Sequence, residues 1–256
     1  MTFGLIGGTG FYSVGEEDSP APAVETRYGP ARLSRVQFAG QEVAFVTRHG
    51  PDHTVPPHRV NYRANIAALR DLGVTNILAS ASVGSLNPQM SPGDLVVLTQ
   101  FLDFTRARAA TFYDDRVVHV DMTKPYCPRL RAELLAAGER LGQRLHPSAT
   151  YVCAEGPRFE TAAEIQMFRQ LGADLVGMTN VPEVVLAREA GLCYAAVALV
   201  CNMAAGISAG PIEHAAVSDF TASHVALLRD LFRTTIEMHS EQDCACRHAV
   251  DKGRAG

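Results

Sequence analysis

The sequence has no tryptophan, and aromatic residues make up only 7% of its 256 residues. It also lacks an excess of positive charge: 27 Asp and Glu residues outnumber 23 Lys and Arg residues, and the formal net charge is -4 at pH 7. Domains that bind nucleic acids are usually basic, because they neutralise phosphates. The composition therefore argues against a nucleic-acid partner.

Long hydrophobic runs are missing as well. No segment approaches the roughly 18 consecutive apolar residues that indicate a membrane-spanning helix. The first ten residues, MTFGLIGGTG, lack the basic start of a secretory signal peptide and lead directly into a strand-like run. We therefore expect no membrane partner.

Cysteines are few and scattered, at positions 127, 153, 193, 201, 244 and 246. Four of them lie in apolar surroundings, where free cysteine behaves as a small hydrophobic residue. We therefore expect a reducing, cytoplasmic compartment and no disulfide framework. Cys244, Cys246 and His248 cluster near the C-terminus, but a metal site there needs a fourth ligand that no second paired motif supplies. We expect no metal, and a loose polar tail over residues 241–256.

Short apolar runs rich in β-branched residues alternate with amphipathic helical runs. The expected strands cover residues 3–6, 43–46, 76–79, 95–98, 150–153, 175–178 and 193–201. The expected helices cover residues 61–72, 128–141, 162–171, 182–190 and 217–239. This alternation predicts one α/β domain over residues 1–240, with helices packed on a largely buried sheet.

Three segments that follow expected strands are suited to anion binding. The GGTG segment at residues 7–10 lets the backbone approach an anion, and Thr9 adds a hydroxyl, although a plain tight turn is the alternative. Its continuation matches neither a dinucleotide fingerprint nor a P-loop. Arg48 and His49 end another strand. A guanidinium can donate two hydrogen bonds to phosphate oxygens, and a histidine can add a further donor. The SASVGS segment at residues 80–85, which includes Ser82, makes a second backbone nest.

Two further segments are suited to a planar base. An aromatic ring such as Phe159 can stack on a purine, and the Glu160 carboxylate can accept the N1–H of a 6-oxopurine. The alternative for Glu160 is a favourable charge near the helix start that Thr161 and Glu164 mark as a capping box. Asn202 ends an apolar strand, and its amide can bridge N7 and O6 of a purine, although asparagine is also common in turns.

Six ordered segments together resemble the trimeric nucleoside phosphorylases, with the methylthioadenosine phosphorylases as the branch most similar. The segments are GGTGFY, TRHG, SVGSL, HVDMTKPYCP, EGPRFETAAE and GMTNVPEVVLAREAGLCYA. The resemblance spans about residues 3 to 235. It implies a twisted mixed sheet between helices and a homotrimer, with a hexamer as the alternative assembly. It also implies inorganic phosphate as co-substrate without an organic cofactor.

The resemblance assigns roles to individual residues. Met178 would lie against the ribose, Phe159 would line the base pocket, and His119 would reach the 5′ substituent in a neighbouring subunit. His214 falls near a position where purine nucleoside phosphorylases place a histidine on the 5′-hydroxyl. The phosphate would be held by Thr9, Arg48, His49, Ser82 and Thr179.

The sequence departs from the adenine-specific branch at two positions. That branch carries aspartates where this chain has Asn202, and usually serine where it has Glu160. Glutamate accepts from the N1–H of hypoxanthine or guanine, whereas an ionised aspartate would repel O6. We therefore expect phosphorolysis of a 6-oxopurine nucleoside, with Asn202, Glu160, Arg48 and His49 as the residues that carry the reaction.

Other functions stay open at this stage. An adenosine-type enzyme, such as a methylthioadenosine phosphorylase, is the first alternative. A nucleoside-binding protein without catalysis is an alternative of another class, and a nucleoside hydrolase would leave the anion-binding segments without a purpose. The sequence leaves open whether the base is hypoxanthine or guanine and whether the 5′ position carries a hydroxyl or a methylthio group.

Overall fold

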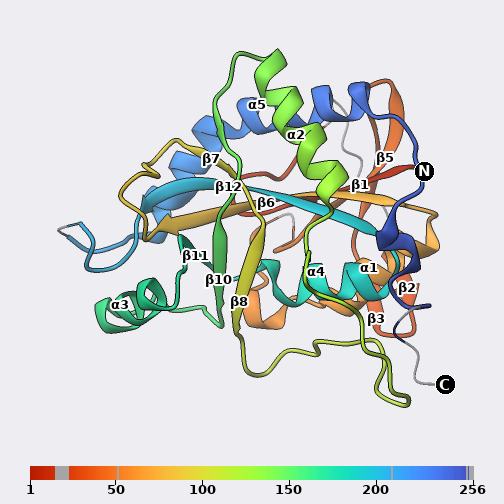
Figure 1. Cartoon of the computed structure of the whole chain (residues 1–256), viewed down its shortest axis with the longest axis horizontal. Helices are drawn as coiled ribbons and strands as arrows, with labels where there is room; N and C mark the ends of the chain where they lie inside the picture. Colours follow the sequence, from red (N-terminus) through yellow and green to blue (C-terminus); the bar gives the residue numbers. More distant parts are fainter. Residues whose placement is uncertain (15–22, 51, 209, 252, 254–256) are drawn as a thin grey trace.

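A computed structural model describes residues 1–14, 23–50, 52–208, 210–251 and 253. Its centre is a mixed ten-stranded sheet whose main path runs β4-β5-β1-β6-β11-β10-β8, with β12 paired to β6 and β7, and β9 paired to β7. In Figure 1 the long strands β6 and β12 cross the direction of β8 and β10, which is the twist of this sheet. The strands of the sheet are β1 (Phe3–Gly7), β4 (Ser34–Phe38), β5 (Gln41–Thr47), β6 (Asn76–Ser85), β7 (Leu95–Val97), β8 (Gln100–Phe104), β9 (Leu145–His146), β10 (Thr150–Ala154), β11 (Leu175–Gly177) and β12 (Cys193–Met203).

Helices cover both faces of the sheet (Figure 1). The helices α1 (Tyr62–Asp71) and α4 (Asn180–Glu189) pack on one face, and α2 (Pro128–Arg140) and α5 (His214–Met238) pack on the other. A short helix, α3 (Ala162–Gln170), packs at one end against β10. The two faces are built by alternation along buried strands: in β12, Ala196 and Ala198 join the first core, whereas Val197 and Leu199 join the second. Among the described residues, no helix is both long and apolar enough to span a membrane.

The predicted α/β fold with a mixed sheet is confirmed, and each expected strand and helix is present. The sequence analysis missed the β2 (Val24–Thr26) and β3 (Gly29–Ala31) ribbon and the strands β4, β8 and β9. These strands are short or lie at an edge of the sheet, so they carry little of the buried apolar pattern on which strand prediction depends.

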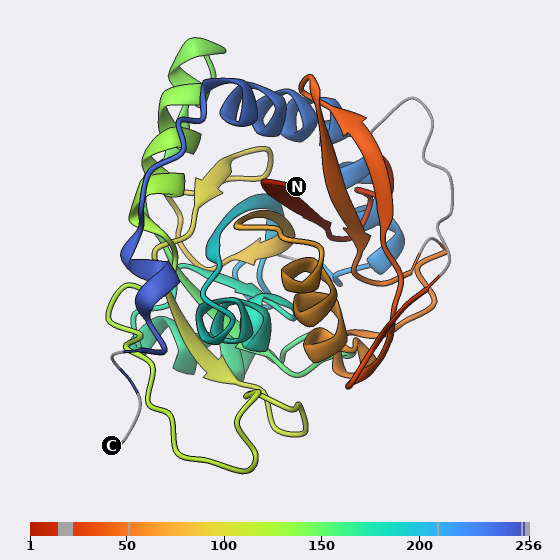
Figure 2. The same ribbon diagram turned by 90° about the vertical axis from the view of Figure 1, so that its right-hand side faces the viewer.

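The chain after residue 240 differs from the predicted loose tail. Residues Ala245–His248 form the short 3-10 helix η2, and the Cys246 side chain is only 2% exposed. Figure 2 shows this C-terminal segment, in blue, descending beside the green chain that leads into α2. The backbone N–H of His119 donates to the carbonyl oxygen of Gly253 at 2.9 Å, so the last described residue is also anchored.

Candidate active site

A cavity of about 530 Å³ lies at the carboxyl ends of β1, β5, β6, β11 and β12. The ends of strands in open α/β sheets are the usual position of ligand sites, and the volume is that of a small-molecule site. Ten of the eleven residues that the sequence analysis singled out line this cavity: Thr9, Arg48, His49, Ser82, Phe159, Glu160, Met178, Thr179, Asn202 and His214.

Gly8 and Thr9 of the GGTG segment line the cavity. The backbone N–H of Gly8 donates to Ser80 Oγ at 3.0 Å, which ties the segment to β6. A Cβ on residue 8 would lie 3.1 Å from both Arg48 Nη1 and the Ser80 carbonyl oxygen. A larger residue there would press on the guanidinium and on the backbone of β6, so glycine is favoured at this position.

Arg48 is fixed by a carboxylate that the sequence analysis did not identify. Its Nε and Nη2 each donate to one oxygen of Glu183 at 2.7 Å, and Nη1 donates to the Ser80 carbonyl oxygen at 3.1 Å. Burial disfavours the charged guanidinium, but the Glu183 carboxylate outweighs this effect and raises the pKa of Arg48. The guanidinium N–H groups that the sequence analysis assigns to phosphate thus bind Glu183. Arg48 offers the cavity a positive charge that is fixed in position.

His49 also differs from the predicted donor. Its Nδ1 lies 2.8 Å from the Val55 carbonyl oxygen, and because a carbonyl only accepts, Nδ1 carries the proton. Burial, and then the Arg48 charge, lowers the pKa of His49 to about 3. The imidazole is therefore neutral, and its Nε2 is an acceptor, suited to a protonated phosphate oxygen.

Two more histidines, His53 and His214, lie beside His49. The His53 ring lies 4.6 Å from the His49 ring and 5.2 Å from the His214 ring, measured between centroids. The Tyr12 hydroxyl lies 3.0 Å from His53 Nδ1. Burial, followed by the His214 charge, lowers the pKa of His53. His53 and His214 both belong to the cavity lining.

Glu160 is a buried carboxylate with a free acceptor. It is 9% exposed, and among the described residues its Oε1 has no hydrogen-bond partner. Burial raises the pKa of this carboxyl. The predicted capping box of α3 is present between Thr161 and Glu164, so the helix cap does not use Glu160. Glu160 and its neighbour Phe159 both line the cavity.

Asn202 is placed by an irregularity in β12. The register of β12 on β6 shifts between Val200 and Asn202, which is a β-bulge around Cys201. Bulges turn a side chain out of its regular position and are common beside active sites. Among the described residues, the only hydrogen bond of the Asn202 side chain runs from Nδ2 to the Met203 carbonyl oxygen at 2.8 Å. The amide thus keeps acceptor and donor capacity for a ligand.

The remaining hydroxyl groups come from three different elements. Ser82 Oγ contacts the Thr9 carbonyl oxygen at 3.4 Å and Thr221 Oγ1 at 3.0 Å, which joins β6 to the turn after β1 and to α5. Thr179 is the N-cap residue of α4, and its backbone N–H donates to Tyr151 Oη at 3.0 Å. Thr9, Ser82 and Thr179 therefore converge on the cavity near Arg48, as the sequence analysis expects for an anion site.

Arg108 is a positioning residue that the sequence analysis missed. Its Nη1 donates to the carbonyl oxygens of Met178 and Val181, both at 2.7 Å, and Nη2 donates to the Glu155 carbonyl oxygen at 2.7 Å. The guanidinium thus joins the chain after β10 to the chain after β11, and these segments carry Phe159 and Met178. No local motif marks this arginine, because its partners are backbone carbonyls distant in the sequence.

His119 is the one predicted site residue outside the cavity lining. It is exposed on the segment between β8 and α2, so it does not contribute to the cavity of its own chain. Within the described part of the chain, the one group with metal-ligand spacing is a set of four cysteines that also lies outside the cavity lining.

Comparisons with known proteins agree with this geometry. A probable 6-oxopurine nucleoside phosphorylase from Dictyoglomus turgidum is 49% identical over 99% of this chain and 98% of its own length. A probable S-methyl-5'-thioinosine phosphorylase from Methanothermobacter thermautotrophicus is 46% identical over 96% of this chain and 88% of its own. The methylthioadenosine phosphorylase of Schistosoma mansoni in complex with adenine superimposes with a TM-score of 0.92, at 32% identity, over 99% of this chain and 98% of that one. Residues 2–237 match the family model of the phosphorylase superfamily, and the chain belongs to that family.

Proposed function

We propose that this enzyme cleaves a 6-oxopurine nucleoside with inorganic phosphate, giving the free base and a ribose 1-phosphate. The observation that carries this proposal is Glu160, a residue that lines the cavity and whose buried Oε1 atom has no hydrogen-bond partner among the described residues. A buried carboxylate oxygen without a donor is costly, so a ligand with a matching N–H gains a large advantage there.

The base is selected by complementary donors and acceptors. A 6-oxopurine carries a hydrogen on N1, which Glu160 accepts, whereas adenine presents a lone pair at N1 and would face the carboxylate unfavourably. Asn202 can donate to O6 or N7 through its amide, and Phe159 supplies an apolar wall for the ring. A site built on hydrogen bonds discriminates strongly, because the wrong base leaves buried groups unpaired.

The phosphate occupies the region around Thr9, Ser82 and Thr179. Arg48 supplies positive charge there, and its fixed position means that no reorganisation is needed when the anion binds. The neutral His49 accepts from a phosphate hydroxyl through Nε2, which selects a phosphate that carries a proton. The bound anion then stabilises the positive charge that develops on the sugar as the glycosidic bond breaks.

Negative charge moves into the purine as the bond to the sugar breaks. An amide is not an acid at neutral pH, so Asn202 acts by hydrogen bonding, and water is the proton source for N7. The contact of Asn202 strengthens as the base departs, and such a contact lowers the barrier more than it tightens substrate binding. The reaction needs phosphate as co-substrate and no organic cofactor.

The 5′ end of the nucleoside lies at the start of α5 in this proposal. His53 and His214 offer polar atoms suited to a 5′-hydroxyl, which favours inosine or guanosine. Ile212 and Val217 line the same cavity and favour an apolar 5′-methylthio group, so 5′-methylthioinosine is the second candidate. The relatives described above include a probable 6-oxopurine nucleoside phosphorylase and a probable S-methyl-5'-thioinosine phosphorylase.

We also propose how the chains assemble and in which compartment the protein resides. The exposed His119 has no place in its own cavity, and a homotrimer, or a hexamer of two trimers, lets it reach the 5′ end of a substrate in the neighbouring subunit. The six cysteines are free in the structure, which suits a reducing cytoplasmic compartment.

The test is the release of hypoxanthine from inosine and from 5′-methylthioinosine, with and without phosphate. We expect base and ribose 1-phosphate in equal amounts, and no release without phosphate. Release without phosphate would indicate a hydrolase, and binding without release would indicate a nucleoside-binding protein; either result contradicts the proposal. Glu160→Ala should lower kcat/KM for inosine by about 100-fold. The control Glu164→Ala removes one bond of the capping box of α3 and the exposed ion pair with Arg158, and it should leave kcat/KM within about threefold of the wild-type value.

A further inference from the structure

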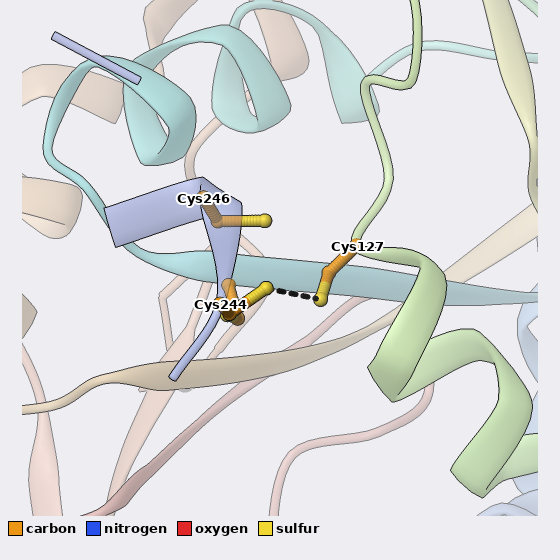
Figure 3. A group of neighbouring side chains, drawn as sticks. Cys127, Cys244 and Cys246 are labelled. Atoms are coloured by element: carbon orange, nitrogen blue, oxygen red, sulfur yellow. Dashed lines mark hydrogen bonds between the residues drawn. The ribbon is translucent and has the colours of Figure 1, made fainter. Parts of the chain in front are cut away.

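We propose that Cys127, Cys193, Cys244 and Cys246 form a structural zinc site that fastens the C-terminal segment to the core. Their sulfur atoms all lie within 4.8 Å of one another, although the residues come from three distant parts of the chain. Figure 3 shows the side chains of Cys244 and Cys246 on the C-terminal segment pointing toward Cys127 at the start of α2. In the sequence only Cys244 and Cys246 are close together. Cys127 and Cys193 come near them only in the folded chain.

The sulfur geometry suits a tetrahedral ion. Zinc–thiolate bonds of about 2.3 Å place the sulfurs of a tetrahedral site about 3.8 Å apart. The Sγ atoms of Cys127 and Cys244 are 3.6 Å apart, and the largest separation in the group requires a movement of about 1 Å to reach the ideal value. A disulfide needs about 2.05 Å, and all four cysteines are free.

Two of the ligands come from elements of the core, and two come from the C-terminal segment. Cys127 is the N-cap residue of α2, and Cys193 is the first residue of the central strand β12. Cys244 and Cys246 flank the start of the 3-10 helix η2. Cys127, Cys193 and Cys246 are buried, and Cys244 is partly exposed, which leaves a route by which an ion can enter.

The charge around the cluster fits a zinc tetrathiolate. Binding of one Zn²⁺ releases the four thiol protons and leaves a net charge of -2 on the complex. Arg129 Nη2 lies 3.5 Å from Cys193 Sγ, and the guanidinium is held in place by Asn76 Oδ1 at 2.6 Å and Glu133 Oε1 at 3.1 Å. A cation held against a thiolate ligand is a common outer partner of a metal site.

Four protein ligands leave no open coordination position, so the proposed ion is structural and takes no part in the reaction. Its effect is to anchor residues 244–246, and with them the segment that reaches the contact between Gly253 and His119. This proposal is independent of the substrate, because none of the four cysteines lines the cavity.

The test is the zinc content of the full-length protein, purified with a reductant and without a chelator. We expect about one zinc per chain, which a thiol-blocking mercurial releases. Replacement by Co²⁺ should give the visible bands and the thiolate-to-metal charge-transfer absorption of a tetrahedral tetrathiolate. Both measurements use the wild-type chain, so they do not depend on whether a variant folds.

Variants separate this site from the other two cysteines. Cys244→Ser, at the partly exposed position, should weaken zinc binding by at least about tenfold. The controls Cys153→Ser and Cys201→Ser should keep the wild-type zinc content. A chain without zinc that has six titratable thiols, or a chain whose mass shows disulfides among these cysteines under native purification, would overturn the proposal. Loss of zinc in the control variants alone would do the same.

Discussion

Arg48 and Glu183 form a two-point ion pair in the interior of the protein, although they lie 135 positions apart in the sequence. Both contacts are 2.7 Å long, and the side chains are 0% and 1% exposed. Tyr194 adds a third bond by donating to Glu183 Oε1 at 2.6 Å. The pair joins the chain after β5 to α4, and so it fixes the charge of Arg48 next to Thr179, the residue that caps α4.

Removal of the Glu183 charge should therefore damage both stability and phosphate binding. Glu183→Gln leaves Arg48 buried without a compensating charge, and we expect the free energy of unfolding to fall by about 3 to 5 kcal/mol. The folded fraction should show a raised KM for phosphate, because the guanidinium is no longer held. Denaturant titration and initial rates at varied phosphate measure the two effects.

The exposed pair of Arg158 and Glu164 provides the matched control. It is also a two-point pair, at 2.8 and 2.7 Å, but the Arg158 side chain is 64% exposed. Arg158→Gln should change stability by about 0.5 kcal/mol or less, because solvent screens exposed pairs. Equal losses of stability in Glu183→Gln and Arg158→Gln would show that burial does not determine how strongly the Arg48–Glu183 pair stabilises the protein.

Asn202→Asp should reverse the base preference. An ionised aspartate repels O6 and N7 of a 6-oxopurine, but it accepts from the 6-amino group of adenine. We expect kcat/KM for inosine to fall by about 100-fold, with a smaller loss or a gain for adenosine. Asn61→Asp makes the same change at the N-cap of α1, outside the cavity, and should leave the ratio of the two substrates unaltered. An unchanged ratio in Asn202→Asp would remove this residue from base selection.

The pH dependence should report Glu160. Burial raises the pKa of this carboxyl, so it takes up a proton at a higher pH than the ordinary value of about 4.3. The protonated form cannot accept from N1–H, and kcat/KM for inosine should fall as the pH drops through the raised pKa. His49 adds no step near neutrality, since its pKa is lowered to about 3.

Glu160→Gln isolates this effect in a pH profile. The amide keeps an acceptor oxygen but does not titrate, so the acidic decline that Glu160 causes should disappear. The ionisation of phosphate is common to both enzymes and cancels when their profiles are divided. An identical acidic decline in both enzymes would assign it to another group.

Arg108 should act on catalysis through the position of its neighbours. Lysine cannot donate to both strand-end segments at once, so Arg108→Lys leaves buried carbonyl oxygens unpaired and should cost about 2 kcal/mol of stability. We expect a large fall in kcat and a smaller change in KM for phosphate. The reason is that Met178 and Phe159 shift, whereas the residues around the phosphate stay in place. Arg106→Lys is the control, since Arg106 is exposed two positions away. A large loss in Arg106→Lys would indicate a general sensitivity of this loop.

The sequence predicts the central fold well because buried elements carry strong patterns. The apolar run of β12 and the capping box at Thr161 are local signals, and both correspond to elements of the structure. The same holds for the cavity lining, since residues at the ends of neighbouring strands meet at one edge of a sheet. Short edge strands such as β9, which has two residues, carry too little pattern to be predicted.

What the sequence does not reveal are partnerships between distant residues. Glu183 reads as an ordinary charge in the first turn of a helix, and only the fold shows that it occupies the fork of Arg48. The proton position on His49 depends on the carbonyl of Val55, six residues away in a turn. Cys127 and Cys193 are 66 positions apart and look like separate core residues until the chain brings their sulfurs together.

The central claim is that the Glu160 and Asn202 site selects a 6-oxopurine. Its most direct test compares kcat/KM for inosine with adenosine, and for 5′-methylthioinosine with 5′-methylthioadenosine, at one saturating phosphate concentration. Each pair shares its sugar, so the ratio reports the base alone. We expect the 6-oxopurine to be preferred by at least about 100-fold in the pair that the 5′ pocket accepts. Equal or faster cleavage of the adenine nucleoside in that pair would contradict the account.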